Sequence, residues 1–423
     1  MISKRTAAFL TFFLSSAMGV TEMVALPAAG GGAPPMLKST STSKLDWASL
    51  TYDSSTITSA SNVTLTSGSP DFEIYAGAFS LAGRWKDGKL YGLTNVGNAP
   101  EDGGCCADSF TVYSSSSPSG DVVDLSFITD LFPSAMDGYA YPTHTFDIVD
   151  DLMYLMVQYK DPTLGAKADA IVVLEMDTYE VVQTAQGDDY FSLYEKLATT
   201  ETDSASSVFN IQHYAASSSD TEEWHGNGVT AFTMQDGTDI LAITHRSFNE
   251  AILMTNPYTA KNGGEIVQRF GKPGLYNAMG KSQTQHDFGG IGSTGGDWNG
   301  MHNVYYSVSP SDGTETITVF VNSDGGSSSA VYNFDINLVS ESDLGSVDDT
   351  AFDTEWRKVS LPFQTGSQGG ARPIGPQYDG SRVFVVASGG ASKGIYVISE
   401  DGEYSNYGDG EGTYDPFVFY TVE

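Results

Sequence analysis

Cysteine and long apolar runs are both scarce in this chain of 423 residues. Its two cysteines, Cys105 and Cys106, are adjacent, and a metal site built from this pair alone is not expected. Two states stay open for them, a strained vicinal disulfide that stiffens the loop or a pair of free thiols. Beyond the N-terminal segment no run reaches the roughly 20 apolar residues that cross a bilayer. We therefore expect no membrane span in the mature chain.

Basic residues are also few in this chain. The chain has 20 basic and 53 acidic residues, and its formal net charge is −33. Such a surface repels phosphate backbones and anionic lipid heads, so nucleic acid and membrane partners are not expected. Acidity of this kind is typical of solubility or of adaptation to high salt. It also makes local positive charge informative, because the chain holds only seven arginines.

The N-terminal segment has the pattern of a secretory signal. Lys4 and Arg5 precede an apolar stretch, Ala7 to Val20, that is followed by small residues. We predict a signal peptide over residues 1–25 and export to the periplasm or the extracellular space. Residues 26–46, rich in Gly, Pro, Ser and Thr, are predicted to be a flexible linker.

Residues 47–423 contain short alternating runs rich in Tyr, Phe, Val, Ile and Thr, with turn residues between them, which is typical of an all-β domain. The runs repeat in fours, and the third run of a module begins 25 to 27 residues after His144, His225 or His302. Four-stranded modules at a long repeat indicate a β-propeller. We predict six blades, with five as the rival count. The last run, "DPFVFYTV", is expected to pair with N-terminal strands and close the ring.

All six histidines lie between residues 144 and 302, which suggests a shared site. His144, His225 and His302 each precede the first run of a module, at spacings of 81 and 77 residues. The first strand of a propeller blade lines the central channel. Residues at equivalent places in consecutive blades should therefore meet near the axis, and we predict that these three imidazoles converge at one mouth of the channel.

Four segments in order carry a resemblance to a known family: "HGNGV", "AITHRSFNEAILMTN", "GGEIVQRFGKPG" and "MHNVYYSVSPSDGTETITVFVNSDG". The chain resembles the arylsulfotransferases over roughly Tyr141 to Gly326, about half its length. The resemblance implies a six-bladed propeller that moves a sulfuryl group from a phenolic sulfate donor to a phenol acceptor through a sulfohistidine. It implies no nucleotide sulfate donor and no cofactor.

Carried over residue by residue, the resemblance makes His302 the nucleophile and places the other catalytic positions on His144, His225 and Arg246. The chain departs from the family pattern in two places, because Met301 stands before the nucleophile instead of glutamine and Asn322 is followed by serine instead of glycine. His286, in "QTQHDF", is a rival nucleophile. Repeat spacing favours His302, because His245 and Asn322 each follow the histidine of their module by 20 residues.

These residue types suit sulfuryl transfer. An imidazole that is uncharged near neutral pH can attack sulfur, and the guanidinium of Arg246 can hold sulfate oxygens that stay anionic throughout. His225 or His144 can protonate the leaving phenolate and later deprotonate the acceptor.

Three further residues are candidates for binding. Asn227 and Asn322 can orient imidazoles or contact sulfate oxygens, and Arg372, in "GGARPIGPQ", opens the following module as a second anion-binding candidate. Zinc-ligand spacing, a glycine-rich phosphate loop and a nucleophile elbow are absent from the sequence.

Two other functions are compatible with a propeller. One is a non-catalytic propeller that binds a sulfated or phenolic ligand. The other is a propeller hydrolase or lactonase, which uses an axial ring of carboxylates and asparagines for a metal; that ring is not found in the sequence. The set of histidines and arginine favours the sulfotransferase.

Overall fold

The computed structural model describes a part of the chain that is mostly β-strand. The described residues are 57–65, 72–79, 82–87, 89–94, 106–114, 117, 120–163, 165–193, 195–196, 225–246, 250–271, 299–309, 312–324, 328–338, 356–365, 369–374, 383–388, 394–399, 402, 404–406 and 415–422. Two short 3-10 helices, η1 (Ser126–Leu131) and η2 (Met136–Gly138), interrupt the strands. None of the helices in these ranges is long and apolar enough to cross a membrane.

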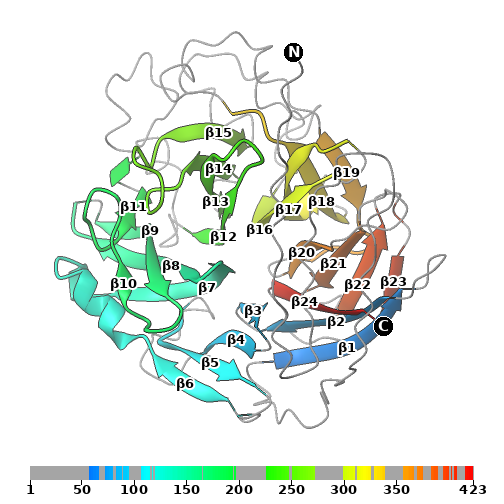
Figure 1. Ribbon diagram of the computed structural model, residues 1–423, viewed down its shortest axis with the longest axis horizontal. Coiled ribbons are helices and arrows are strands. Elements are labelled where there is room, and N and C mark those ends of the chain that lie inside the picture. Colours follow the sequence, from blue (N-terminus) through cyan, green and yellow to red (C-terminus); the bar gives the residue numbers. More distant parts are fainter. Residues whose placement is uncertain are drawn as a thin grey trace, which may run out of the picture.

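Six antiparallel sheets surround a common centre (Figure 1). The first blade consists, from the centre outward, of β24 (Asp415–Val422), β2 (Phe72–Phe79) and β1 (Ile57–Leu65). The second consists of β3 (Gly83–Lys86), β4 (Lys89–Thr94), β5 (Ser109–Tyr113) and β6 (Asp121–Asp124). The third consists of β7 (Ala140–Val149), β8 (Leu152–Asp161), β9 (Ala166–Glu175) and β10 (Val181–Val182), with β11 (Phe191–Ser192) also paired to β9.

The other three blades have four strands each. The fourth consists of β12 (Gly226–Thr233), β13 (Asp239–His245), β14 (Glu250–Thr255) and β15 (Ile266–Gly271). The fifth consists of β16 (Asn299–Val308), β17 (Glu315–Asp324), β18 (Ser328–Asp335) and β19 (Trp356–Ser360). The sixth consists of β20 (Gly369–Ile374), β21 (Val383–Ser388), β22 (Gly394–Ser399) and β23 (Tyr404–Asn406).

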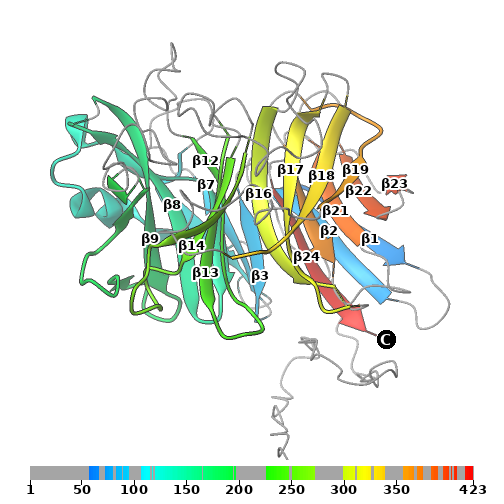
Figure 2. The ribbon, with the colours of Figure 1, turned by 90° about the horizontal axis from the view of Figure 1, so that it is seen from above.

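The last strand of the chain closes the ring. β24 pairs antiparallel with β2 along its whole length, from Phe72 opposite Val422 to Phe79 opposite Asp415. It also contacts the innermost strands of the two adjacent blades, β3 and β20, while β7, β12 and β16 complete the inner circle. The side view shows the blades packed face to face (Figure 2). The fold is therefore a six-bladed β-propeller, and the alternative of five blades is wrong.

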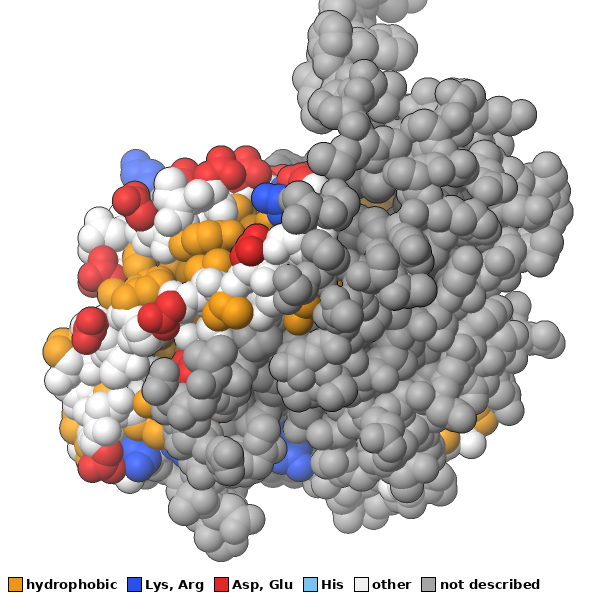
Figure 3. Space-filling view, turned by 90° about the horizontal axis from the view of Figure 1, so that it is seen from below, with side chains coloured by type: hydrophobic (Ala, Val, Ile, Leu, Met, Phe, Trp, Pro, Cys, Tyr) orange, Lys and Arg blue, Asp and Glu red, His pale blue; other side chains and the backbone are white. Residues whose placement is uncertain are grey.

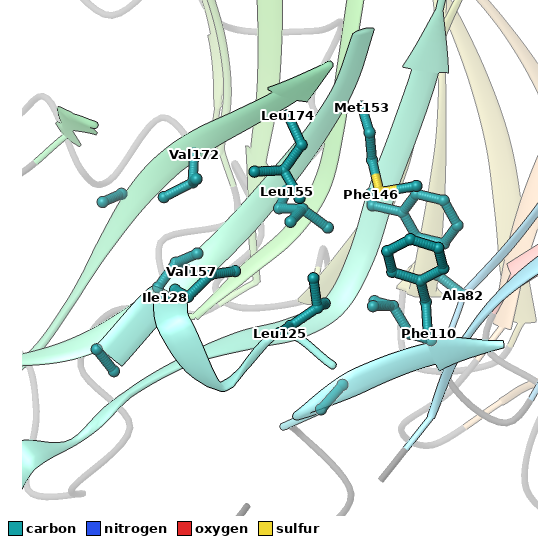
Figure 4. Close-up of a cluster of buried hydrophobic side chains, with 14 of the residues drawn as sticks. Ala82, Phe110, Leu125, Ile128, Phe146, Met153, Leu155, Val157, Val172 and Leu174 are labelled. Carbon is teal, nitrogen blue, oxygen red and sulfur yellow. The ribbon is translucent and has the colours of Figure 1, made fainter. Parts of the chain in front are cut away.

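The blades are held together by strands that are buried on both faces. In β8, Met153, Leu155 and Val157 pack into the core toward the second blade, while Tyr154 and Met156 pack into the core toward the fourth. Burial on both faces explains why this strand reads as an almost continuous apolar run. Figure 4 shows the first of these cores, to which the second blade contributes Phe110 and η1 contributes Ile128.

The structure adjusts the sequence prediction at the inner strands. β12 begins directly after His225, but β7 begins four residues before His144 and β16 three residues before His302. Only His225 therefore stands at the opening of its strand. Register shifts interrupt the pairing of all three strands, and in β7 and β16 the pairing continues on the N-terminal side of the shift. The predicted signal peptide, linker and domain start at residue 47 lie outside the described residues.

Replacing Phe110 with alanine tests the packing between blades. Its side chain is fully buried, so Phe110→Ala should lower the free energy of unfolding by about 3–5 kcal/mol. The matched control, Val122→Ala on β6, removes a side chain that is 58% exposed and should change it by less than about 0.5 kcal/mol. Denaturant unfolding followed by tryptophan fluorescence measures both, and equal losses would contradict the assigned core.

Candidate functional site

His302 and Asn227 meet between two adjacent blades. The Asn227 side-chain nitrogen, Nδ2, lies 3.1 Å from Nδ1 of His302 and donates to the Met301 carbonyl oxygen at 3.2 Å. The same Nδ2 lies 3.4 Å from Nε2 of the ring, and the tautomer of His302 decides which ring nitrogen accepts from the amide. Both side chains are buried, His302 at 2% exposure. Two predicted site residues far apart in the sequence are thus in contact.

Glycines allow this close approach of β12 and β16. A Cβ on Gly228 would lie 2.7 Å from the backbone of Asn303, so only glycine lets the two innermost strands come this near. On β16, Gly300 has a φ of +74°, and a Cβ there would lie 2.4 Å from Oδ1 of Asn322.

His225 and Arg246 lie at one edge of the fourth blade. The Arg246 backbone N–H donates to the His225 carbonyl oxygen at 2.9 Å, and both side chains are half-buried. His144 lies on β7, the innermost strand of the third blade, between the buried Thr143 and Thr145; its own side chain is not described. The three histidine positions therefore belong to the innermost strands, or the residue before one, of three consecutive blades.

Asn322 has a different setting from His245, although both follow a motif histidine by 20 residues. His245 pairs with Gly226, whereas His302 pairs with Phe320 and Asn322 lies two residues further along β17. The Asn322 amide donates to Thr365 Oγ1 at 2.6 Å, which ties β17 to the segment after β19. Equal spacing in the sequence does not give equal positions in the sheets. His286 lies outside the described residues.

A buried acid that the sequence analysis did not single out supports the start of β12. Asp169, at the head of an apolar run on β9, is fully buried and accepts the Gly226 backbone N–H at 2.7 Å. Its Oδ2 lies 3.5 Å from Nδ1 of His245. Burial raises the pKa of Asp169 to about 7, although the Gly226 hydrogen bond opposes that rise. In the sequence, an acidic residue directly before the apolar run of β9 is the feature that indicates this buried carboxyl.

Charged and aromatic side chains also gather on the inner strands. Arg84 on β3 is 2% exposed, and its Nε donates to Asp147 Oδ1 on β7 at 2.8 Å. Tyr305 on β16 lies beside two guanidiniums, those of Arg84 and Arg372, with Cζ 5.3 and 5.0 Å from its ring centroid. Arg372 was predicted from the sequence. Arg84 was missed, because β3 is four residues long and shows no clear alternation.

Cys106 lies against the strand that carries His144. It forms an isolated β-bridge with Thr143, and its Sγ is 3.2 Å from the Tyr139 hydroxyl. Cys106 is disulfide-bonded, and the other cysteine of the chain, Cys105, lies outside the described residues. Within the described ranges no group of three or more His, Cys, Asp or Glu side chains could hold a metal ion.

Comparison with known proteins gives no family. No family model matches the chain, and no curated protein matches it. Solved structures with similar strand arrangements include a GH43 β-1,3-galactosidase with galactodeoxynojirimycin (9% identity, TM-score 0.37, covering 77% of this chain and 92% of that one). Others are an exo-1,5-α-L-arabinanase from a bovine ruminal metagenomic library (11%, 0.35, 82% and 98%) and a putative 6-phosphogluconolactonase from Bacteroides uniformis (11%, 0.34, 87% and 100%). Similarities this low carry no inference about activity or ligand.

The raised pKa of Asp169 predicts a pH-dependent stability. The carboxyl ionises near pH 3.8 in the unfolded chain and near 7 in the folded one, so its contribution is complete below about pH 4 and is lost as the pH rises through 7. The stability of the wild type relative to Asp169→Asn should therefore fall by on the order of 4 kcal/mol between pH 4 and pH 8.

Thermal or denaturant unfolding across this pH range measures the difference. Asp236→Asn is the matched control, because Asp236 is exposed and hydrogen bonds to Thr238 lower its pKa. It should leave the slope between pH 5 and pH 8 unchanged. A difference for Asp169→Asn that stays constant with pH would mean that a charged His245 compensates the carboxylate.

Proposed function

We propose that this chain is an exported aryl-sulfate sulfotransferase with His302 as its nucleophile. The observation that carries the proposal is the contact of Asn227 with His302 between the innermost strands of two blades. It joins two residues that the family resemblance selected independently of any structure. The placement of the other two histidine positions on adjacent blades, with the Arg246 backbone N–H donating to the His225 carbonyl oxygen, is consistent with the same site.

The reaction would run in two halves. A lone pair of the neutral His302 imidazole forms a bond to sulfur as the bond from sulfur to the phenolic oxygen breaks, and the departing phenolate takes a proton from His225 or His144. A phenol then attacks the sulfohistidine, gives its proton to the same group and receives the sulfuryl group. The Asn227 amide nitrogen lies within hydrogen-bond distance of both ring nitrogens, so the amide must move away from the one that attacks.

A specific observation favours a second candidate, a propeller that binds a sulfated or phenolic ligand without turnover. His302 is 2% exposed and its ring packs edge-on toward Phe320, with centroids 6.3 Å apart, which also suits an imidazole that only holds two blades together. The two candidates differ in one measurable property, the formation of a bond between sulfur and nitrogen.

Incubation with a chromogenic phenyl sulfate, with and without added phenol, tests the proposal. Phenol-dependent release of colour is expected from the wild type, and His302→Ala should lower it by at least about 1,000-fold. His286→Ala, which removes the rival nucleophile, is the matched variant and should retain activity. The labelled peptide after sulfuryl trapping should contain residue 302. Wild-type protein that shows no release but still binds the phenyl sulfate would establish the second candidate.

Asn227 is proposed as a positioning residue for His302. Asn227→Ala should lower kcat about 100-fold with little change in KM, because a small displacement of the reacting ring is costly while substrate contacts remain. Asn256→Ala is the control, since Asn256 is equally buried in the same blade but donates to Tyr154. Equal loss of kcat in the two variants would show that Asn227 acts only through stability.

A further inference from the structure

Arg84 and Asp147 form a balanced pair of charges on the inner strands. Arg84 is bound by Asp147, whose second oxygen, Oδ2, accepts a hydrogen bond from the Thr230 hydroxyl on β12. Arg84 also donates through Nη1 to the Gly83 carbonyl oxygen at 2.8 Å. The Asp147 carboxylate is thus occupied by donors from two other blades, and it balances the charge of Arg84.

A second guanidinium lies on the same aromatic ring without such a balance. Cζ of Arg372, on β20, is 5.0 Å from the centroid of Tyr305, and Cζ of Arg84 is 5.3 Å from it. A tyrosine ring attracts a cation at this distance. Two cations beside one ring also repel each other, so the arrangement gains from any negative charge placed near Arg372.

Arg372 has unused hydrogen-bonding capacity. Its Nη1 is buried and finds no hydrogen-bond partner among the described residues, and no carboxylate in those residues lies within ion-pair distance of it. The residue as a whole is half-buried, and of its three guanidinium nitrogens Nη1 alone is buried without a partner among the described residues. A buried donor without an acceptor is costly, and the planar fork of arginine matches two oxygens of one oxyanion.

The surrounding charge makes such a position selective. The chain carries a net charge of −33, and Asp and Glu side chains are spread over the described part of the face in Figure 3. The group formed by Arg84, Asp147 and Arg372 has one net positive charge on the innermost strands. Anions that are repelled from the outside are attracted to this positive charge.

We propose that Arg372 and Tyr305 form a binding site for a small oxyanion of the sulfate or carboxylate class, with the Arg84–Asp147 pair supporting the ring. The site is separate from the proposed nucleophile. Tyr305 follows His302 by three residues on β16. A register shift lies between them, so their partners on β17, Thr318 and Phe320, are two residues apart, which corresponds to about 7 Å along the strand. The inference therefore holds whether or not His302 transfers a sulfuryl group.

Isothermal titration of the full chain with sodium sulfate at low ionic strength tests the site. The wild type should bind one sulfate, and Arg372→Gln should raise its Kd at least tenfold. Arg357→Gln is the matched control. Arg357, on β19, is 38% exposed and 3.7 Å from Asp335, so this change removes the same charge from an outer strand. It should alter Kd less than twofold.

Three further titrations separate the alternatives. His302→Ala should keep the sulfate affinity within twofold, and a large loss would place the anion at His302 and overturn the proposal. Tyr305→Leu, which keeps both arginines, should weaken binding, with folding checked by near-ultraviolet circular dichroism. Sodium acetate in place of sulfate distinguishes a carboxylate from a sulfate ligand. No binding to the wild type, or equal losses in Arg372→Gln and Arg357→Gln, would also overturn the site.

Discussion

The pairing of β24 with β2 is the constraint on which the rest of this structure depends. It joins β24, near the C-terminal end, to β1 and β2 in one sheet. The innermost strand of the first blade is therefore the last strand in the sequence. Closure places each innermost strand between two neighbours, and the inner strands β7, β12, β16, β20, β24 and β3 contact one another in turn around the ring. The Asn227–His302 and Arg84–Asp147 contacts each join the innermost strands of two neighbouring blades.

Close packing at the centre has an energetic consequence for polar groups. Strands such as β8 bury both faces in apolar cores, so acids and bases on the inner strands lose water and need partners from other blades. Arg84 donates to Asp147, and Asp169 accepts the backbone N–H of Gly226. Burial raises the pKa of Asp169. A polar group whose partners are incomplete, as at Arg372, is then the natural place for a ligand.

The two proposals concern different parts of one inner surface. His302 and Tyr305 lie on the same strand, and Asn227 and Thr230 lie on the strand beside it. If both hold, the channel combines a reactive imidazole with a cationic place for the anionic part of a ligand. The physical basis of each is separate, since one depends on the lone pair of a ring nitrogen and the other on the unmatched charge of a guanidinium.

The sequence by itself determined the fold class, the blade pattern and the closing role of the last strand, because alternation and turn residues are local signals that repeat. It also indicated Asn227, His302 and Arg372, which lie on or beside inner strands. Only the tertiary structure decided which of these residues touch. His245 and Asn322 follow their motif histidines by the same number of residues, but register shifts give them different positions in their sheets. Arg84 lies beside Tyr305 although its strand, β3, is four residues long and shows no alternation in the sequence. Contacts between blades depend on pairing and packing across long separations, which no local pattern records.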